Sequence, residues 1–407
     1  MKYLILGAGP AGLALACKLY QNGTGDFLVL EKEAEAGGLC RSVMVDGAPF
    51  DIGGGHFLDV RRPAVDAFLF QFMPEEEWEL FERNSLIEIN GYLISHPIEA
   101  NIWQMSLDDQ VEYLKSIAAA GCNHAEPMPE EFTDWIYWKL GERIASDYMI
   151  PYNRKMFGRE LNRLGTYWME KLPNVSFEET LRSCLMKRAF GSEPGHARFY
   201  YPKEYGYGEL WKRMADAIGD HIRYNTQVQG IDFGDMSVLT SDGRAFGADV
   251  IVTTIPWTEL RWLIGMPEEI KESIGELQFS SIVTEYFPEH LDTAAQWIYY
   301  PDPELDYHRI LVRHNFCRGS RGYWTETNAE RFHPEASCGN YHYVNEYAYP
   351  LNTRGKPEIM ARLLAWSREQ NVYGLGRWGE HQHYNSDVVV ERALKLADEL
   401  MGAAAPL

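Results

Sequence analysis

The chain has 407 residues, enough for about two or three domains of roughly 100–200 residues each. It is 45% apolar, 24% charged and 13% aromatic, a composition that excludes disordered, fibrous and low-complexity proteins. Asp and Glu number 59 against 38 Lys and Arg, and the net charge of −21 repels phosphate backbones, so we expect no nucleic-acid partner. An anionic small molecule would need a local cluster of cations acting against this field.

The cysteines and the N-terminus bear on the compartment. The six cysteines form no C-x-x-C pair, no Cys/His metal spacing and no disulfide rhythm; they are Cys17, Cys40, Cys122, Cys184, Cys317 and Cys338. The apolar N-terminal run is interrupted by glycines and Pro10 and precedes no cleavage site of small residues, so it is unlike a signal peptide. No other stretch approaches the length of a membrane span. We therefore expect a cytoplasmic protein with reduced thiols, no metal site and no integral membrane segment.

The start of the chain predicts the opening of a nucleotide-binding domain. An apolar run at Tyr3–Leu6 is bounded by glycines, helical spacing follows over Leu13–Tyr20, and a second apolar run covers Asp26–Leu30. This order predicts a strand, a tight turn, a helix and a second strand, which together make a βαβ unit.

Further regions follow along the chain. Residues 107–188 show long amphipathic spacing with few β-branched runs, which predicts an inserted helical region. Strand patterns return at His221–Phe233 and Asp249–Ile255, and we assign both to the nucleotide-binding domain. From Ser280 to Tyr349 alternating Tyr, Trp, Val and Ile residues favour an antiparallel sheet, and a final helix is expected from Val388 onward.

Gly7, Gly9 and Gly12 form a G-x-G-x-x-G sequence that follows a predicted strand and opens a predicted helix. Gly7 permits the tight turn, Gly9 lets the backbone approach a pyrophosphate, and Gly12 lets the helix meet the strand. Glu31 ends the next strand, where it can accept hydrogen bonds from ribose hydroxyls. A glycine triplet alone also occurs in simple tight turns, but the full context favours dinucleotide binding. It does not separate FAD from NAD.

Two more glycine-rich segments follow this unit. Residues 35–42 read EAGGLCRS and residues 50–56 read FDIGGGH. Here the sequence resembles the FAD-binding superfamily of amine oxidases, protoporphyrinogen oxidases and UDP-galactopyranose mutases. The resemblance implies that these segments border FAD, with Arg41 near the diphosphate and His56 beside the isoalloxazine; on its own, His56 would be interpreted as a hydrogen-bonded turn residue. The cofactor-binding residues implied in these segments are Gly38, Arg41, Gly54, Gly55 and His56.

The C-terminal end carries a similar resemblance. Residues 371–387 read NVYGLGRWGEHQHYNSD and look like the closing flavin motif of the mutases, a glycine-arginine pair followed by an aromatic residue and Asn-x-Asp. A helix N-terminus at this point can hold a flavin carbonyl and ribityl hydroxyls through backbone N–H groups. Without the resemblance, Asp387 would be an ordinary helix N-cap. The cofactor contacts implied are Gly376, Arg377, Asn385 and Asp387, together with Val228 beside the adenine.

Segments in the middle of the chain resemble the UDP-galactopyranose mutases in the same order, among them PYNRK at 151–155, YHRI at 307–310 and YAYP at 347–350. The implied substrate contacts are Asn153, Trp168, Lys171, Arg309, Tyr349 and Tyr384. Arg309 is the implied main clamp on a diphosphate. Lys171 stands where the family has an arginine, and since a lysine cannot bind a diphosphate bidentately, the identity of the substrate stays open.

The resemblance implies an α/β fold class, with an FAD-binding Rossmann-type domain, an inserted helical domain and an antiparallel β-sheet substrate domain. No Ser/Gly linker separates these domains, so we expect them to interleave along the chain. The expected ranges are 1–90, 195–260 and 360–407 for the FAD-binding domain, 100–190 for the helical insertion, and 91–99 and 261–359 for the substrate domain.

The function implied by the resemblance is interconversion of the pyranose and furanose forms of a nucleotide-diphosphate sugar. In the family the reduced FAD is the active form and its N5 is the nucleophile, so the protein positions charge; the expected catalytic residues are His56, Arg309 and Lys171. NAD(P)H is a candidate reductant, and a homo-oligomer is left open. The alternative function is an oxidoreductase of the amine oxidase or desaturase type, whose flavin takes a hydride under an aromatic cage. A third interpretation is a flavin-binding protein without catalysis.

Overall fold

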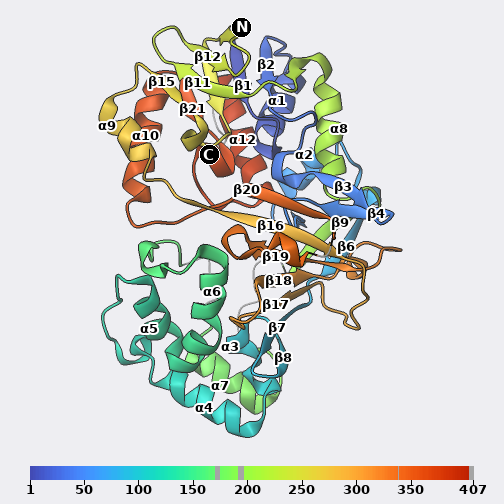
Figure 1. Ribbon diagram of the computed structural model, residues 1–407, viewed down its shortest axis with the longest axis vertical. Coiled ribbons are helices and arrows are strands. Elements are labelled where there is room, and N and C mark those ends of the chain that lie inside the picture. The colour runs from blue at the N-terminus through green and yellow to red at the C-terminus, as the bar shows by residue number, and fades with distance from the viewer. Residues whose placement is uncertain (170–174, 191–196, 338, 403–407) are drawn as a thin grey trace.

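The structure, a computed structural model, describes residues 1–169, 175–190, 197–337 and 339–402. Three parts follow one another along its longest axis (Figure 1). A parallel five-stranded sheet with its helices lies at one end, a group of helices lies at the other, and a seven-stranded sheet crosses between them. This arrangement confirms the predicted α/β fold class.

Five short apolar strands form the parallel sheet. In order across the sheet they are β10 (Ile222–Arg223), β2 (Phe27–Leu30), β1 (Tyr3–Leu6), β14 (Val250–Thr253) and β21 (Val372–Gly374). All residues of β1 are buried, as is usual at the centre of a parallel sheet with both faces covered. Because side chains alternate along a strand, Tyr3 and Ile5 pack into one hydrophobic core, and Leu4 and Leu6 pack into another.

Helices cover both faces of this sheet. The first core is closed by α1 (Pro10–Gln21), which packs against α8 (Gly208–Ile218) and α12 (Ser386–Leu400). The second core includes residues of α9 (Glu268–Ile274) and α10 (Lys356–Glu369). The predicted βαβ opening is confirmed, and Pro10 stands in the first turn of α1, where its missing N–H costs no helical hydrogen bond.

A four-stranded sheet lies against the second core. Its order is β13 (Ala245–Gly247), β12 (Ser237–Thr240), β11 (Val228–Asp232) and β15 (Trp262–Ile264). The prediction of one strand over 221–233 is wrong, because Asn225 adopts a left-handed φ of 50° that separates β10 from β11. Strand β15 lies within the predicted substrate range 261–359, yet it pairs with β11 in the part of the molecule that contains the parallel sheet, which we call the cofactor side after the predicted FAD-binding domain.

The seven-stranded sheet separates the cofactor side from the inserted helices (Figure 1). Its order is β20 (His342–Pro350), β16 (Phe279–Phe287), β19 (Tyr323–Asn328), β18 (Tyr307–Leu311), β17 (Trp297–Tyr299), β7 (Ser85–Ile89) and β8 (Tyr92–Ser95). The antiparallel sheet predicted for 280–349 is confirmed, with one parallel pair between β17 and β7. Strand β7 lies within the range 1–90 expected for the FAD-binding domain, yet it pairs with β17 in this sheet. The sequence could not show this, because an alternating pattern indicates that one face of a strand is buried but not which sheet the strand joins.

The helical insertion consists of α3 (Ile98–Asn101), α4 (Leu107–Ala118), α5 (Phe132–Ile144), α6 (Ile150–Phe157) and α7 (Phe177–Met186). Helix α5 buries Phe132, Ile136 and Leu140, and this four-residue spacing is the amphipathic pattern visible in the sequence. A π-helical turn at Ala145–Met149 joins α5 to α6. Of the helices that the structure describes, none is long and apolar enough to span a bilayer.

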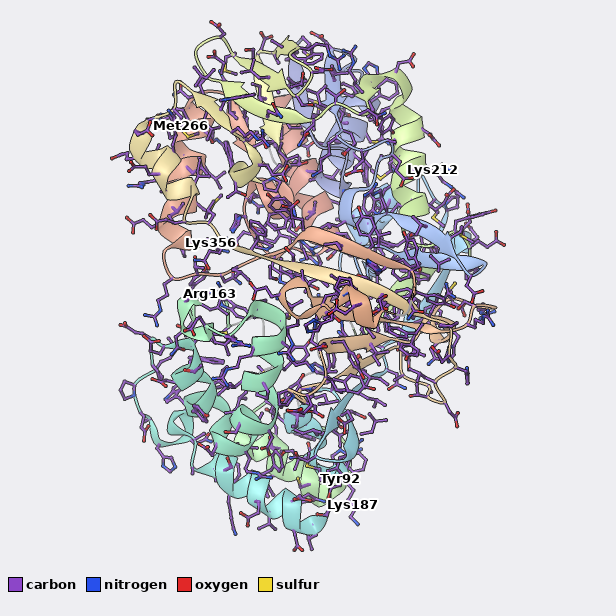
Figure 2. All side chains as sticks on the ribbon, viewed as in Figure 1. Tyr92, Arg163, Lys187, Lys212, Met266 and Lys356 are labelled. Atoms are coloured by element: carbon purple, nitrogen blue, oxygen red, sulfur yellow. The ribbon has the colours of Figure 1, made fainter. Side chains whose placement is uncertain are left out.

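The insertion meets the cofactor side at a narrow polar junction. Leu164 and Thr353 form an isolated antiparallel bridge, and Figure 2 shows Arg163 and Lys356 on the two sides of this junction. The ammonium of Lys356 is buried and donates to the carbonyl oxygen of His381 at 3.1 Å. This ammonium also lies 5.7 Å from the centre of the Tyr167 ring of the insertion, and the Tyr167 hydroxyl donates to the carbonyl oxygen of Thr353 at 3.2 Å. Backbone pairing and these two contacts therefore join the two parts.

Short elements complete the fold around the glycine-rich segments. They are the hairpin β3 (Ser42–Val45) and β4 (Ala48–Asp51), the sheet of β5 (Leu58–Asp59), β9 (Arg198–Pro202) and β6 (Trp78–Glu82), and the helices α2 (Pro63–Leu69) and α11 (Gly376–Gly379). The β3–β4 hairpin carries the chain from the second glycine-rich segment to the third.

A buried arginine fastens this hairpin to the seven-stranded sheet. Arg313 has no exposed surface, and its Nη1 donates to the carbonyl oxygens of Val45 at 2.8 Å and Ala48 at 3.2 Å. Its Nε donates to the carbonyl oxygen of Arg321 at 2.8 Å, and the guanidinium lies over the Tyr286 ring. Several buried backbone acceptors therefore depend on one side chain.

We expect Arg313→Met to lower the free energy of unfolding by roughly 3–5 kcal/mol, because the substitution leaves buried carbonyl groups without donors. Urea unfolding measures the loss. The control is Arg318→Met, whose side chain is 79% exposed and pairs with Glu79, and it should cost less than about 1 kcal/mol. Equal losses in the two variants would contradict the assignment.

Candidate functional site

A cavity of about 330 Å³ opens at the carboxyl ends of β1, β2 and β14, where parallel strands bring distant loops to one edge. Segments from both ends and the middle of the chain contribute to it. The predicted cofactor residues in its lining are Gly7, Gly9, Glu31, Gly38, Arg41, His56, Val228 and Arg377.

The three glycines of the first motif differ in what surrounds them. Gly7 has a φ of 102°, and a Cβ on it would lie 2.6 Å from the Thr254 hydroxyl. A Cβ on Gly12 would overlap the carbonyl oxygen of Gly7, so α1 packs directly on the end of β1. A Cβ on Gly9 would meet only the Cα of Gly38, at 3.9 Å. The fold therefore needs Gly7 and Gly12, whereas Gly9 keeps the cavity open.

Glu31 ends β2 at the cavity wall, as its place in the sequence predicts. It is 6% exposed, and its carboxylate accepts the N–H groups of Ala8 at 2.7 Å and Glu33 at 2.9 Å. Burial raises the pKa of Glu31, and these two donors oppose the rise. Each carboxylate oxygen keeps acceptor capacity for a ribose hydroxyl.

Arg41 lines the cavity and is fixed from two sides. Its Nε donates to the carbonyl oxygen of Gly38 at 3.2 Å, and its Nη2 donates to the Tyr343 hydroxyl at 2.8 Å. Glu33 and Glu35 lie 3.7 and 3.5 Å from its Nη1. Tyr343 of β20 was not predicted, because nothing local in the sequence signals its contact with a residue 302 positions away.

The third glycine-rich segment packs closely against the seven-stranded sheet beside the cavity. Gly54 has a φ of 85°, and a Cβ on it would overlap the carboxylate of Glu326; a Cβ on Gly55 would overlap a side chain of β18. His56 follows, with its Nδ1 3.3 Å from the carbonyl oxygen of Gly54. Burial lowers the pKa of His56 to about 4, and Arg377 acts in the same direction, so this histidine is neutral at pH 7.

A buried carboxyl group, that of Asp51, lies at the start of this segment. Asp51 has no exposed surface and accepts hydrogen bonds from the Ser42 hydroxyl at 2.5 Å, the Tyr201 hydroxyl at 3.0 Å and the Tyr207 N–H at 3.3 Å. Burial raises the pKa of Asp51 to about 7 against the opposing effect of these donors. The backbone carbonyl of Asp51 also accepts the Gly54 N–H at 3.0 Å, so the carboxyl group and the glycine turn are held as one unit.

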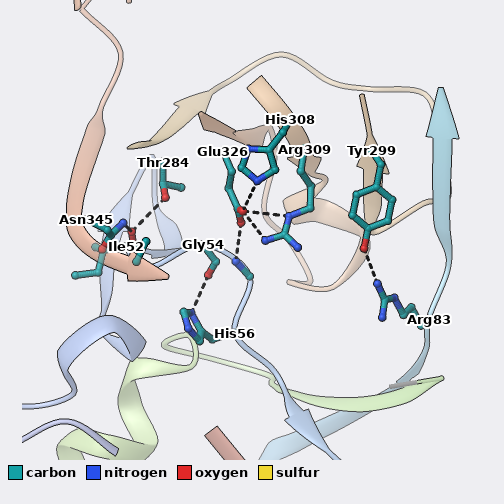
Figure 3. A network of polar contacts seen from close by, with 12 residues as sticks. Ile52, Gly54, His56, Arg83, Thr284, Tyr299, His308, Arg309, Glu326 and Asn345 are labelled. Atoms are coloured by element: carbon teal, nitrogen blue, oxygen red, sulfur yellow. Dashed lines mark hydrogen bonds and ion pairs between the residues drawn. The ribbon is translucent and has the colours of Figure 1, made fainter. Parts of the chain in front are cut away.

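Asn345 of β20 lines the cavity and carries a side-chain oxygen without a partner in the part of the chain that the structure describes. Its Nδ2 donates to the carbonyl oxygen of Ile52 at 2.6 Å, and Thr284 donates to the same oxygen at 3.2 Å (Figure 3). The Oδ1 of Asn345 is buried and has no hydrogen-bond partner among the described residues. Buried acceptors without partners are rare, so this atom is a candidate acceptor for a donor on a ligand. The sequence gives no signal for it, because β20 buries Asn345 and exposes the neighbouring Val344.

The C-terminal motif closes the cavity. Arg377 lines it and donates to the carbonyl oxygens of Tyr384, at 2.9 and 3.1 Å, and Ala348, at 3.2 Å. Burial lowers the pKa of Arg377. Gly376 has a φ of 77°, and a Cβ on it would lie 2.7 Å from the Cβ of Ala11, so α11 packs closely on α1.

The interpretation of Asp387 as the N-cap of α12 is wrong, because Asn385 occupies that position. Three successive residues of capping type stand here, and their sequence alone does not select one. The buried carboxylate of Asp387 pairs with Arg62, and Asp387 is not among the residues that line the cavity. Ser386 lines it instead and shares a hydrogen bond of 2.6 Å with the Tyr207 hydroxyl. Cofactor contacts by Asn385 and Asp387 remain predictions.

Figure 3 shows the charged residues on the sheet side of the glycine turn. Arg309 of β18 donates to the carboxylate of Glu326 of β19 through Nε, at 3.1 Å, and through Nη2. The Gly55 N–H donates to the other oxygen of Glu326 at 3.2 Å. Burial by itself would raise the pKa of Glu326, but Arg309 and His308 outweigh it and hold the pKa at about 2. Glu326 was missed, although a charged residue in an otherwise buried strand, YWTETN, is a signal for it.

The other predicted substrate residues fall into two groups. The guanidinium carbon of Arg377 lies 6.0 Å from the centre of the Tyr349 ring. Burial raises the pKa of the Tyr349 hydroxyl, and Arg309 is also close enough to this hydroxyl to oppose the rise. Tyr349 therefore lies between Arg377, which lines the cavity, and Arg309. Tyr384 lines the cavity.

Asn153 and Trp168 lie within the helical insertion. The Nδ2 of Asn153 donates to the carbonyl oxygen of Met149 at 2.7 Å, and the Trp168 ring stacks on Phe132 at 5.7 Å. Lys171 lies outside the described residues.

Comparison with known proteins places the chain in a family. The family described as flavin containing amine oxidoreductase matches residues 10–287. An uncharacterized protein in the nifH2 3′ region of Methanothermococcus thermolithotrophicus is 49% identical over 53 residues, which are 13% of this chain and 50% of that protein. The chain thus matches half the length of that relative.

Solved structures share the fold. Reduced UDP-galactopyranose mutase has a TM-score of 0.90 at 22% identity, covering 99% of this chain and 94% of that chain. Putrescine oxidase bound to putrescine has 0.64 at 15%, covering 98% and 99%. The CLA-producing fatty acid isomerase from P. acnes has 0.61 at 15%, covering 98% of each chain. The predicted resemblance is confirmed for family and fold.

The cavity fits FAD, the cofactor that this family implies. The bare backbones of Gly9 and Gly38 face each other where a diphosphate needs close approach, and the buried carboxylate of Glu31 suits ribose hydroxyls. The unpaired Oδ1 of Asn345 suits an N–H at the edge of a flat ring. Among the residues described, no group of three or more His, Cys, Asp or Glu side chains could hold a metal ion.

We expect Gly9→Val to fold and to lose bound FAD, because a Cβ there lies 3.9 Å from the nearest protein atom, whereas a side chain at this position fills the space that a diphosphate needs. Flavin absorbance of the purified protein and its circular dichroism measure the two effects. The matched variant Gly12→Val should lose folded protein as well, since its side chain overlaps backbone. A yellow Gly9→Val protein would contradict the assignment.

Asp51 predicts a pH dependence of stability. Its pKa in the folded protein, about 7, lies above the ordinary value of 3.8, so the unfolded chain loses this proton first and stability falls between pH 4 and 7. We expect Asp51→Asn to reduce that fall by roughly 2–4 kcal/mol in urea unfolding at constant FAD loading. The control Asp46→Asn should leave it unchanged, because Arg321 lowers the pKa of Asp46 to about 2 and the contribution of that residue changes only below pH 4. An unaltered profile in Asp51→Asn would rule the explanation out.

Proposed function

The chain belongs to the flavin-containing amine oxidoreductase family, and from that premise we propose that it is an FAD-dependent mutase that interconverts the pyranose and furanose forms of a nucleotide-diphosphate sugar. The observation that carries the proposal is the guanidinium of Arg309, fixed beside the glycine turn by the buried carboxylate of Glu326. A fixed guanidinium suits a diphosphate. The fold similarity to UDP-galactopyranose mutase over 99% of the chain supports this choice.

The cofactor site has defined tasks in this proposal. FAD, when bound and reduced, supplies a nucleophilic nitrogen, N5, for reaction at the anomeric carbon of the sugar. Gly9 and Gly38 would hold its diphosphate, Glu31 would accept from its ribose, and Asn345 would accept from the edge of its ring. His56 stays neutral at pH 7 and shapes the reactive side of the ring without adding a charge.

The substrate side supplies positive charge and hydrogen-bond donors. Arg309 would bind the diphosphate, and the Tyr349 hydroxyl, placed near both Arg309 and Arg377, would donate to it. Lys171 would be a second cation. The remaining proposed contacts are Asn153, Trp168 and Tyr384.

The second candidate is an oxidoreductase of the amine oxidase type, which the family description and the fold of putrescine oxidase favour. A substrate that binds as a cation is favoured by a nearby carboxylate whose charge is not already paired. The carboxylate beside the glycine turn, Glu326, is already paired with Arg309. This pairing favours an anionic substrate over a cationic one.

We expect the dithionite-reduced holoenzyme to interconvert the ring forms of at least one member of a panel of nucleotide-diphosphate sugars, without stoichiometric consumption of reductant. The oxidised enzyme should be inactive, and product analysis by chromatography measures both. NAD(P)H is the candidate physiological reductant. Oxygen consumption and peroxide formation with an amine would establish the second candidate instead.

We expect Arg309→Ala to weaken binding of the nucleotide sugar by roughly 2–5 kcal/mol in calorimetry while the flavin stays bound. Because this change leaves Glu326 buried without its main partner, the double variant Arg309→Ala/Glu326→Gln separates the loss of the diphosphate contact from the cost of an unpaired charge. Lys171→Ala should cost less than Arg309→Ala. Unchanged affinity in both Arg309 variants would exclude this substrate site.

A further inference from the structure

Glu326 has two cationic or potentially cationic neighbours on one oxygen. Arg309 donates to its Oε2 through Nε at 3.1 Å, and the Nε2 of His308 lies 3.6 Å from the same oxygen (Figure 3). Glu326 and His308 are both almost completely buried. His308 is therefore placed where a proton on its ring would form a second ion pair with Glu326.

The His308 ring has few polar contacts. Neither ring nitrogen has a hydrogen-bond partner among the described residues, and the ring meets the edge of Tyr152 at 5.8 Å. The charged groups that face it are Glu326, Arg309 and, from α6, Lys155, whose ammonium donates to two backbone carbonyl groups. Burial lowers the pKa of His308, the nearby carboxylate of Glu326 opposes this, and Arg309 and Lys155 add to the lowering. The net shift is downward from the ordinary value of 6.5, so the ring is neutral at pH 7 in the free protein.

An anionic ligand at Arg309 would change the balance of charge around the Glu326 carboxylate. The diphosphate of a nucleotide sugar brings two negative charges to Arg309, which then serves the ligand as well as Glu326. The buried carboxylate is left short of positive charge, and an unpaired buried charge is costly. A proton on His308 restores the balance without any large movement, because the ring already lies 3.6 Å from Glu326.

We propose that His308 takes up a proton from solvent when an anionic substrate binds at Arg309, and that its imidazolium then shares the pairing of Glu326. The inference rests on the proposed function for its ligand. His308 acts as a positioning residue: it keeps Glu326 charged and fixed at the Gly55 N–H while Arg309 engages the diphosphate. The proton returns to solvent when the ligand leaves.

Binding and proton uptake are thus linked. Calorimetry of a UDP-sugar binding to the oxidised holoenzyme at pH 7, in phosphate and in Tris buffer, measures the number of protons taken up. A UDP-sugar carries no phosphate group that titrates near this pH, so the protein supplies the signal. We expect the uptake to approach one proton, with affinity falling by up to about tenfold per pH unit above neutrality. His308→Asn should show neither effect, and His308→Asn flavin content should be unchanged.

The control is His314→Asn, which removes a histidine whose ring nitrogens also lack partners among the described residues but which stacks on His290, outside the contacts of Glu326. This variant should keep the proton uptake. Binding of the UDP-sugar without proton uptake by the unaltered protein would overturn the inference and leave the proposed function standing.

A second measurement needs no substrate. In Arg309→Met the main partner of Glu326 is gone, so His308 should carry a proton at pH 7, whereas Arg309→Lys should keep it neutral. Nitrogen chemical shifts of ¹⁵N-labelled histidines report the charge, and His308→Asn identifies the signal. A neutral His308 in Arg309→Met would overturn the inference. A charged His308 in Arg309→Met, together with no binding of any UDP-sugar by the unaltered protein, would support the proton exchange and overturn the proposed substrate.

Discussion

The ion pair between Arg309 and Glu326 is the interaction on which the arrangement beside the flavin site depends. Moving two charges out of water is costly, and the cost is offset only when geometry and hydrogen bonding are good. Here two guanidinium donors and the Gly55 N–H meet the carboxylate. The pair therefore joins β18, β19 and the glycine turn, and it fixes both Arg309, the proposed substrate cation, and the backbone of Gly55.

The glycine turn is held from two sides, which explains its composition. The Gly54 N–H donates to the backbone carbonyl of Asp51. The carboxylate of Glu326 lies so close to Gly54 that a Cβ on this residue would overlap it. Because these neighbours leave no room around it, the glycine turn has little freedom to move when a ligand binds. The adjustment to an added negative charge then falls to groups that can change protonation in place, and His308 is such a group.

Features with local causes could be predicted from the sequence, and features with distant causes could not. The βαβ unit, the close packing at Gly7 and Gly12, and the position of Glu31 follow from residues within a short segment. Asn345 and Tyr343 acquire their contacts only when β20 crosses the cavity, and no nearby residue announces this. The break between β10 and β11 was missed because a single left-handed residue, Asn225, divides an apolar run that otherwise looks continuous.

The charge of the whole chain and the charge at the site point in opposite directions. The protein carries a net charge of −21, which disfavours anions at its surface. Beside the glycine turn, Arg309 and Arg377 are opposed by the carboxylate of Glu326, while His56 is neutral. Electrostatic interactions in a buried site are screened less than those at the surface, so these few buried groups act more strongly on a bound ligand than the surface charges do. An anionic ligand in so acidic a chain therefore depends on individual guanidinium groups held in place by the fold, and the proposed diphosphate site rests on one of these, Arg309.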